Sequence, residues 1–309
     1  SCEILLILER DRMRKLALSD EILLKVDKAA RYIGGEVNSV MKDKNEVEIR
    51  FAMCFPDVYE IGMSNLGMMI LYNMFNQRED VWCERLFSPW PDLDKVMREK
   101  KIPLFALESQ EPIRDFDFLG ITIGYEMCYT NILQVLDLSG IPLKSADRGE
   151  DFPIVIGGGA CAYNPEPLAP FFDMFYIGEG ETVYDALFDA YKANKKAGGS
   201  RKDFLLAAAK IPGIYVPSLY EVTYKEDGTI ASFAPTADGV PEKVQKQLII
   251  DMEKEYRAVE APVVPHIKAT QDRVTLEIQR GCIRGCRFCQ AGMIYRPCLL
   301  YTSPSPRDA

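Results

Sequence analysis

The sequence lacks any apolar run of the roughly 18 residues that a membrane-spanning helix needs. A short apolar stretch at residues 4–8 follows an acidic residue and precedes no small-residue cleavage site, so we infer no signal peptide. Positive charge is also scarce, because 37 Lys and Arg stand against 46 Asp and Glu, a formal net charge of −9. We therefore expect a cytoplasmic protein with no membrane span and no general affinity for nucleic acid.

Histidine is almost absent, whereas cysteine is plentiful. The single histidine, His266, lies in a proline-punctuated stretch and is expected to be a linker residue. Six of the nine cysteines are scattered, as expected of buried small apolar residues in a protein without a secretion signal. These six are Cys2, Cys54, Cys83, Cys128, Cys161 and Cys298. The other three fall within eight residues near the end of the chain.

Strand-like and helix-like segments alternate from about Val47 to Tyr191, and glycine follows several of the expected strands. We expect strands at 47–55, 104–107, 118–123, 153–156 and 174–177. We expect helices after an N-cap at Ser64, around 93–97, at 129–138 with Gly140 as its stop, from 181 to about 192, and at 204–211, with a loop at 192–202. This alternation predicts an α/β fold with a doubly wound Rossmann-like domain and a mostly parallel sheet.

The clustered cysteines, Cys282, Cys286 and Cys289, have the spacing C-x3-C-x2-C. Three thiolates on one short loop can hold three irons of a 4Fe-4S cluster and leave the fourth iron open to a substrate or cosubstrate. Gly281 and Gly285 allow the loop to curl tightly. Nearby positive charge, which favours thiolates, comes from Arg280, Arg284 and Arg287.

This spacing, with Phe288 directly before the third cysteine and an expected strand at 274–278 before the first, resembles the radical S-adenosylmethionine (SAM) superfamily. The resemblance implies that the open iron binds SAM and that reductive cleavage releases a 5′-deoxyadenosyl radical. It also implies a reductant such as flavodoxin or ferredoxin, and a partial TIM-type barrel whose first strand is 274–278. It identifies no catalytic side chain and leaves the substrate open.

A structural zinc site is the alternative interpretation of the same cysteines. A zinc knuckle needs a fourth ligand, which could be His266 or Cys298. His266 lies 16 residues before Cys282, an unusual spacing for such a site. An iron cluster and zinc differ in colour, because only the iron cluster absorbs visible light near 400 nm.

The order of an α/β domain followed by a cluster loop resembles the cobalamin-binding subgroup of the superfamily. The resemblance covers about residues 20 to 297 and implies that three loops border a cofactor. The candidate cofactor-binding residues are Asp57, Tyr59, Gly62, Gly157, Gly158, Gly159, Gly178, Glu179 and Gly180. Cobalt-ligating members carry D-x-H-x-x-G, but Tyr59 replaces the histidine here. Two alternatives follow: cobalamin is bound without that lower ligand, or the fold is kept without cobalamin.

The expected organisation has five segments. Residues 1–12 are interpreted as a non-native leader, 13–210 as the Rossmann-like domain, and 211–265 as a β-hairpin and proline-rich linker. Residues 266–297 would begin the radical SAM barrel, and 298–309 resemble a translated sequencing adapter, although a natural Ser/Pro-rich tail is the alternative. A chain that ends there is expected to be inactive. The functional alternative is a corrinoid- or partner-binding module with structural zinc.

Overall fold

The computed structural model describes residues 15–252, 259–273, 275 and 277–300. The expected leader, residues 301–309 of the expected tail and two residues of the expected strand 274–278 lie outside this part. The chain divides into two compact units, which are described separately below. Unit 1 comprises the described residues up to 122, with 127–156 and 259–272. Unit 2 comprises residues 123–126 and the described residues of 157–258 and 273–309.

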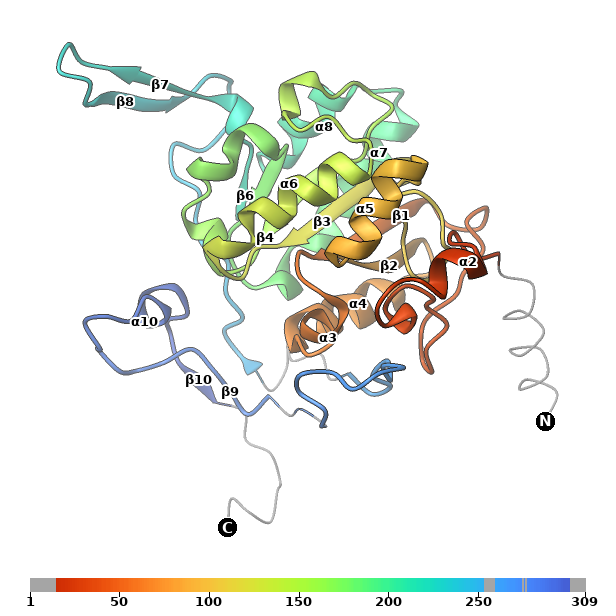
Figure 1. The fold of residues 1–309 in the computed structure, drawn as a ribbon. Coiled ribbons are helices and arrows are strands. Elements are labelled where there is room, and N and C mark those ends of the chain that lie inside the picture. The colour runs from red at the N-terminus through yellow and green to blue at the C-terminus, as the bar shows by residue number, and fades with distance from the viewer. Residues whose placement is uncertain (1–14, 253–258, 274, 276, 301–309) are drawn as a thin grey trace. The chain divides into compact units, whose positions relative to one another are not determined.

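Six strands form a sheet in the order β2-β1-β3-β4-β5-β6 (Figure 1). β1 pairs in parallel with both β2 and β3, whereas β5 pairs antiparallel with β6. The expected α/β class with a mostly parallel sheet is confirmed. The strands are β1 Ile49–Phe55, β2 Val81–Phe87, β3 Phe118–Thr122, β4 Ile154–Gly158, β5 Met174–Tyr176 and β6 Ile214–Tyr215.

The core of unit 1 is built around β1. All seven residues of β1 are buried, because the strand is hydrogen-bonded on both edges and covered on both faces. The ring of Phe51 packs against Phe75 at 5.0 Å and against Phe118 at 5.8 Å between centroids. The strand expected at 47–55 is therefore confirmed over Ile49–Phe55.

Helices surround the strands of unit 1 at nearly the expected places. α4 Leu66–Asn76, α5 Pro91–Lys100 and α6 Tyr129–Leu138 were all expected, and Gly140 with φ +65° follows α6 as predicted. The shorter helical turns are α2 Asp20–Leu23, α3 Tyr59–Gly62, η1 Ala29–Arg31, η2 Ile113–Asp115 and η4 Ser145–Asp147; η3 Glu126–Cys128 contains residues of both units.

Two expectations for unit 1 are wrong. Asn65, not Ser64, caps α4, because the Asn65 side chain accepts the Met68 N–H at 2.9 Å while Ser64 Oγ donates to the Glu60 carbonyl. Residues 104–107 form no strand, since only Phe105 makes an isolated bridge, to Pro112. β2, which pairs with one edge of β1, was not expected, because the adjacent charged residues Glu84 and Arg85 masked the apolar character of its segment.

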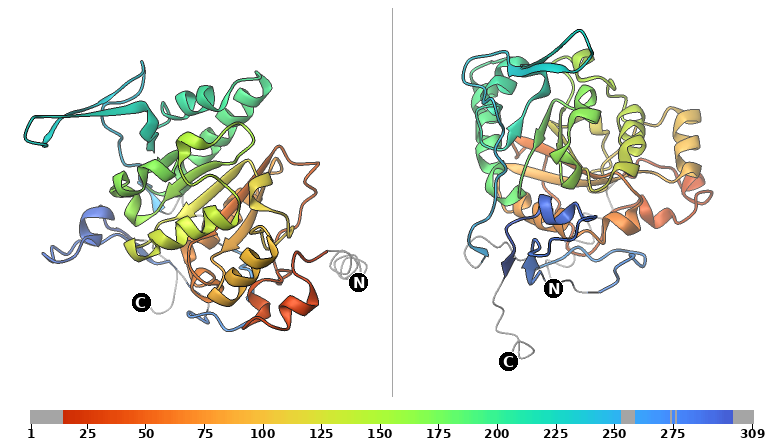
Figure 2. Two further views of the ribbon diagram at one scale, coloured as in Figure 1. Left: turned by 45° about the horizontal axis from the view of Figure 1, so that its top comes forward. Right: turned by 90° about the vertical axis from the view of Figure 1, so that its left-hand side faces the viewer.

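Unit 2 contains β5, β6 and two helices, α7 Tyr184–Lys196 and α8 Arg201–Ala208. The loop expected at 192–202 is therefore shorter than predicted, because α7 continues to Lys196 and Ser200 begins α8 with a capping box. The expected hairpin is confirmed as β7 Tyr220–Tyr224 and β8 Ile230–Pro235, which extends as a two-stranded arm (Figures 1 and 2). The 3-10 helices of unit 2 are η5 Ala160–Tyr163, η6 Glu166–Phe171, η7 Gly180–Thr182 and η8 Pro217–Leu219.

The cysteine region of unit 2 contains β9 Gln279–Arg280, α10 Ala291–Ile294 and β10 Leu299–Leu300 (Figure 1). The strand expected at 274–278 is not found in its described residues, and β9 begins just after it. A strand needs a hydrogen-bonded neighbour, and β10 offers one only to Gln279 and Arg280. Among the described residues, no helix combines the length and apolar character needed to cross a membrane.

The cap of α4 can be tested by substitution. Asn65→Ala leaves the Met68 N–H without its side-chain acceptor and is expected to lower the free energy of unfolding by about 1 kcal/mol. Asn65→Asp is the matched control, because a carboxylate caps equally well and suits the positive end of the helix dipole. Urea unfolding followed by circular dichroism measures both. An equal decrease of the free energy of unfolding in both variants would show that Asn65 does not stabilise the protein by capping α4.

Candidate functional site

The first candidate loop follows β1 in unit 1. It turns directly into α3, and the Asp57 Oδ1 accepts the backbone N–H of Val58 at 2.7 Å. Gly62 lies at the end of α3, where a Cβ would overlap the ring of Phe87. The glycine of this motif therefore has a packing role, because it allows α3 to approach the end of β2.

Tyr59 points into the interior and not toward solvent. Its side chain is 1% exposed, and its ring packs edge-to-face on Phe87 at 5.3 Å. The hydroxyl donates to Glu36 Oε1 at 2.9 Å and accepts the His266 N–H at 3.3 Å. Burial, reinforced by the Glu36 carboxylate, raises the pKa of Tyr59 above its ordinary value. The phenol thus stays protonated and hydrogen-bonded within the protein.

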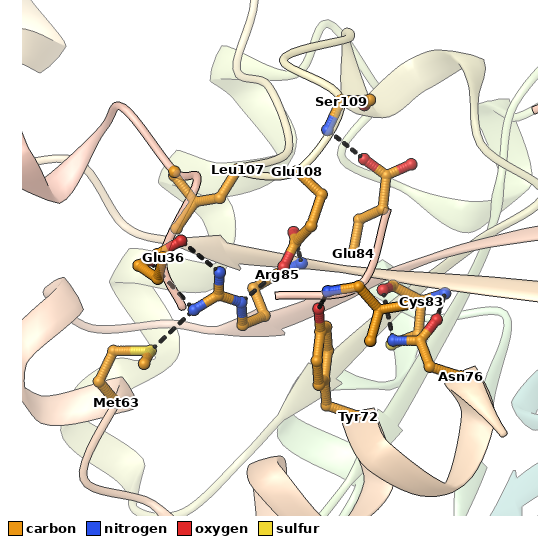
Figure 3. A network of polar contacts seen from close by, with 12 residues as sticks. Glu36, Met63, Tyr72, Asn76, Cys83, Glu84, Arg85, Leu107, Glu108 and Ser109 are labelled. Carbon is orange, nitrogen blue, oxygen red and sulfur yellow. Dashed lines mark hydrogen bonds and ion pairs between the residues drawn. The ribbon is translucent and has the colours of Figure 1, made fainter. Parts of the chain in front are cut away.

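Glu36 links Tyr59 to a fully buried guanidinium in β2, that of Arg85 (Figure 3). Arg85 donates from Nη2 to Glu36 Oε2 at 2.7 Å and from Nε to Glu108 Oε1 at 2.6 Å. Glu108 also accepts the Arg85 backbone N–H at 2.6 Å, and Met63 Sδ lies 3.2 Å from Nη1. One cation is therefore shared by two carboxylates, and all three side chains are fully buried.

The charges in this network stabilise one another. Burial alone would raise the pKa of Glu36, but Arg85 outweighs it and the pKa is lowered. For Glu108 burial dominates and raises the pKa. Burial opposes the charged form of Arg85, yet the two carboxylates hold its pKa well above the ordinary value. Removing Arg85 would leave both carboxylates without their cation, and breaking a buried ion pair in this way typically costs about 3–5 kcal/mol.

The segment 259–272 lies along the same loop of unit 1. The Thr270 N–H donates to the Glu60 carbonyl at 3.1 Å, and the Gln271 N–H donates to Ser64 Oγ at 2.9 Å. The Nε2 atom of His266 lies 3.0 Å from the carbonyl oxygen of Gly34. The imidazole thus contacts the backbone within unit 1, to which residues 259–272 belong.

Glu60 adds a buried carboxylate to this loop. Its carboxylate binds Arg31 at 2.8 Å and Lys28 at 2.9 Å. Burial alone would raise the pKa of Glu60, but these two cations lower it to about 2. The loop that the resemblance assigns to a cofactor is therefore held within unit 1 in three ways. Tyr59 hydrogen-bonds Glu36, the segment 259–272 hydrogen-bonds the loop, and Glu60 forms ion pairs with Arg31 and Lys28.

The glycine loop of unit 2 begins inside β4. Gly157 is buried and Gly158 ends the strand, whereas Gly159 is exposed and precedes η5. The Gly158 carbonyl accepts the Ile123 N–H at 2.6 Å. This loop places η5, which contacts α10 of the cysteine region.

The Gly178–Glu181 loop of unit 2 lies against the backbone of Gln247. Gly178 has φ +142°, and a Cβ there would overlap the Gln247 main chain, so only glycine fits this approach. Glu179 donates its N–H to the Gln247 carbonyl at 3.0 Å, and its Oε2 accepts the Ile249 N–H at 2.7 Å. Gly180 begins η7.

The two glutamates of this loop face Arg280, two residues before the first clustered cysteine. Arg280 Nη2 lies 2.8 Å from Glu181 and Nη1 lies 3.5 Å from Glu179. Arg280 also makes two bonds to Glu277, at 2.8 and 2.9 Å. Sequence reasoning identified the loop and the arginine but did not connect them, because their separation of about 100 residues gives no local signal.

The cysteine loop is closed at its base. Gly281 has φ +81°, and a Cβ there would overlap the carbonyl oxygens of Tyr295 and Pro297. The Arg296 guanidinium donates to the Arg284 carbonyl at 3.1 Å across the loop. Glycine at 281 is therefore required where the two ends of the loop meet.

The three clustered thiols lie on this loop without disulfide bonds. Cys286 is exposed, and Cys282 and Cys289 are half-exposed. Cys282 Sγ accepts the Arg284 N–H at 3.4 Å. Within the part of the chain that the structure describes, no three His, Cys, Asp or Glu side chains surround a common metal position. The donor set suits an iron–sulfur cluster, because three accessible thiols share one short loop.

Residues 67–217, just under half of the chain, match the family described as radical SAM proteins, N-terminal. An uncharacterized protein of Methanocaldococcus jannaschii is 26% identical over 247 residues, which cover 80% of this chain and 42% of that protein. The chain thus spans less than half the length of this relative. The family match supports a relation to radical SAM proteins.

One solved structure is similar in part. It is the radical SAM methyltransferase TsrM from Kitasatospora setae, with tryptophan substrate and a SAM analog bound. The similarity has a TM-score of 0.33 and 14% identity, and covers 58% of this chain and 29% of that one. A likeness at this level supports no inference about the present chain.

The hydrogen bond of Tyr59 can be tested by Tyr59→Phe. This variant removes a donor from the buried Glu36 carboxylate and is expected to lower the free energy of unfolding by about 1–3 kcal/mol. Tyr224→Phe, at a hydroxyl-bearing residue that is 65% exposed, is the control and should change stability by less than about 0.5 kcal/mol. Urea unfolding compares the two. A Tyr59→Phe variant as stable as the wild type would contradict this role.

Proposed function

We propose that the protein is a radical SAM enzyme in which Cys282, Cys286 and Cys289 hold three irons of a 4Fe-4S cluster. The single observation that carries this proposal is the closed loop with three accessible thiols at C-x3-C-x2-C spacing. The family match over residues 67–217 supports it independently. When bound, such a cluster supplies an electron for reductive cleavage of SAM at its open iron.

The residues of the chain prepare the loop for this role. The Arg284 N–H donates to Cys282 Sγ at 3.4 Å and so helps to orient this ligand. Arg284 and Arg287 add positive charge to the loop, which would offset the negative charge of a cluster. The proposal includes a cytoplasmic location and a one-electron reductant such as flavodoxin or ferredoxin.

Iron binding is the direct test of the cysteine assignment. Anaerobic reconstitution with iron and sulfide is expected to give about four irons per chain and an absorbance shoulder near 400 nm. Cys282→Ala, Cys286→Ala and Cys289→Ala are each expected to abolish stable incorporation, because two thiolates do not retain the cluster. Electron paramagnetic resonance of the reduced protein should change on addition of SAM.

Cys298→Ala is the matched control, because Cys298 lies beside the loop but outside the three-cysteine pattern. It is expected to bind iron like the wild type. Tight zinc binding without iron, lost in Cys298→Ala or His266→Ala, would instead support a structural zinc site. That outcome would overturn the radical SAM proposal and favour a binding module.

Corrinoid binding by the α/β domain is a second candidate function, favoured by the strand order. From β2 to β5 the order is 2-1-3-4-5, as in flavodoxin-like sheets, which bind ligands where the carboxyl ends of β1 and β3 meet. The loop after β1 is the one that contains Asp57 and Tyr59. Because the Tyr59 hydroxyl is buried on Glu36, a corrinoid here would bind without a lower ligand from this residue.

Equilibrium dialysis against hydroxocobalamin tests this candidate. It predicts about one corrinoid per chain, with the same affinity in Tyr59→Phe, because the phenol is no ligand of cobalt. Loss of binding in a folded Tyr59→Phe variant would assign the hydroxyl to the cofactor. Absence of binding by the wild-type chain would overturn the candidate.

A further inference from the structure

We propose that Glu179, Glu181 and Lys246 are positioning residues that hold the cysteine loop by its two ends. This inference rests on the proposed function, since it gives the Gly178–Glu181 loop a role toward the cluster-binding loop. All the residues involved belong to unit 2. The loop assigned by resemblance to a cofactor thereby acts on protein, not on a bound ligand.

The first end of the cysteine loop is held through Arg280. Its side chain is 13% exposed, and those of Glu181 and Glu179 are 8% and 14% exposed. Arg280 Nη2 lies 2.8 Å from both Glu181 and Glu277, so the guanidinium meets carboxylates from two segments. Water therefore screens these contacts little, and they are stronger than a surface ion pair.

Glu179 is itself fixed by contacts that do not involve Arg280. Glu179 Oε2 accepts the Ile249 N–H at 2.7 Å, and the close approach of Gly178 to Gln247 fixes the loop backbone. The hydroxyl of Tyr176 donates to the Glu179 carbonyl at 2.6 Å. The Glu179 carboxylate is thus held in place as an acceptor for Arg280, and the Glu181 carboxylate follows two residues later on the same loop.

The second end of the cysteine loop is held through Lys246. Its ammonium donates to the carbonyl oxygens of Ile294 and, at 2.8 Å, of Arg296. Ile294 is the last residue of α10, and the C-terminal end of a helix favours a nearby cation. Lys246 lies in the segment that binds the Gly178–Glu181 loop, one residue before Gln247.

The two contacts together span the three cysteines. Arg280 lies two residues before Cys282, and Ile294 lies five residues after Cys289. A loop fixed at both ends loses less conformational entropy when its thiolates converge on a cluster. The same contacts would hold the cluster in one orientation and thus influence its reduced-state spectrum.

The contacts of Arg280 and of Lys246 together are called the clamp. Hydrogen exchange measured by mass spectrometry tests this clamp in the full chain without metal. The double variant Glu179→Gln/Glu181→Gln, the variant Arg280→Gln and the variant Lys246→Met are each expected to speed amide exchange across 281–296 about tenfold. Exchange in β5 and α7, which both belong to unit 2, should stay at the wild-type rate and would show that unit 2 remains folded. Arg280→Lys keeps the charge and is expected to recover part of the protection.

Two matched controls separate positioning from other effects. Arg287→Gln removes a charge from the same loop without touching the two glutamates, and Arg201→Gln breaks a buried ion pair of unit 2 with Asp173. Neither should change exchange across 281–296. If Arg280→Gln and the double glutamine variant exchange at the wild-type rate, or if Arg287→Gln matches them, the clamp is wrong.

Iron loading then distinguishes this inference from the proposed function. In reconstituted protein, the clamp variants are expected to bind less iron and to show altered g values of the reduced cluster, whereas Arg201→Gln, which breaks the ion pair with Asp173 away from the cysteine loop, keeps the wild-type iron content and g values. Unchanged iron content and g values would overturn the positioning role even if the loop becomes more mobile. A wild-type chain without iron would refute the proposed cluster, while the metal-free exchange rates would still decide the clamp.

Discussion

The buried guanidinium of Arg85 determines how unit 1 is assembled. It lies in β2 and holds Glu36 from the chain before β1 and Glu108 from the chain after α5. Through Glu36 it also fixes Tyr59, and Tyr59 in turn receives the His266 N–H. A buried cation must be surrounded by acceptors, so these segments have little freedom to move independently. This requirement fixes the position of Tyr59 in the loop after β1. The ring of Phe87 leaves no room for a side chain at Gly62 in the same loop.

In unit 2, Arg280 likewise joins distant segments through ion pairs. A half-buried guanidinium again gathers carboxylates from distant segments, here Glu179 and Glu181 from the loop after β5 and Glu277 from the same stretch of chain. The difference lies in what each arginine carries. Arg85 sits in the middle of a strand and stabilises the core, whereas Arg280 sits at the base of a loop with three accessible thiols. Position in the chain, not residue type, separates a structural from a functional ion pair.

Local patterns predicted much of the fold. The helix 129–138 and its glycine stop, the strand 118–123 and the hairpin after Pro217 depend on short-range signals, and all three are confirmed. β2 was missed because Glu84 and Arg85 interrupt an apolar segment, and their burial becomes possible only when Arg50 and Glu108 approach from elsewhere. The cysteine spacing was visible in the sequence. The contacts of Arg280 and Lys246 were not, since each joins residues about 50 to 100 positions apart.

The Gly178–Glu181 loop shows why a motif alone does not fix a role. Glycine and glutamate after a strand suit a cofactor loop, because glycine lets a ligand approach the backbone and glutamate can hydrogen-bond it. Here the close approach to Gly178 is made by Gln247, and the carboxylates meet Arg280 and the Ile249 N–H. A ligand that used the same carboxylates would first have to displace Arg280 and expose a charge at the base of the cysteine loop. Binding there and an ordered cysteine loop would therefore oppose each other, so we assign the loop to holding the cysteines.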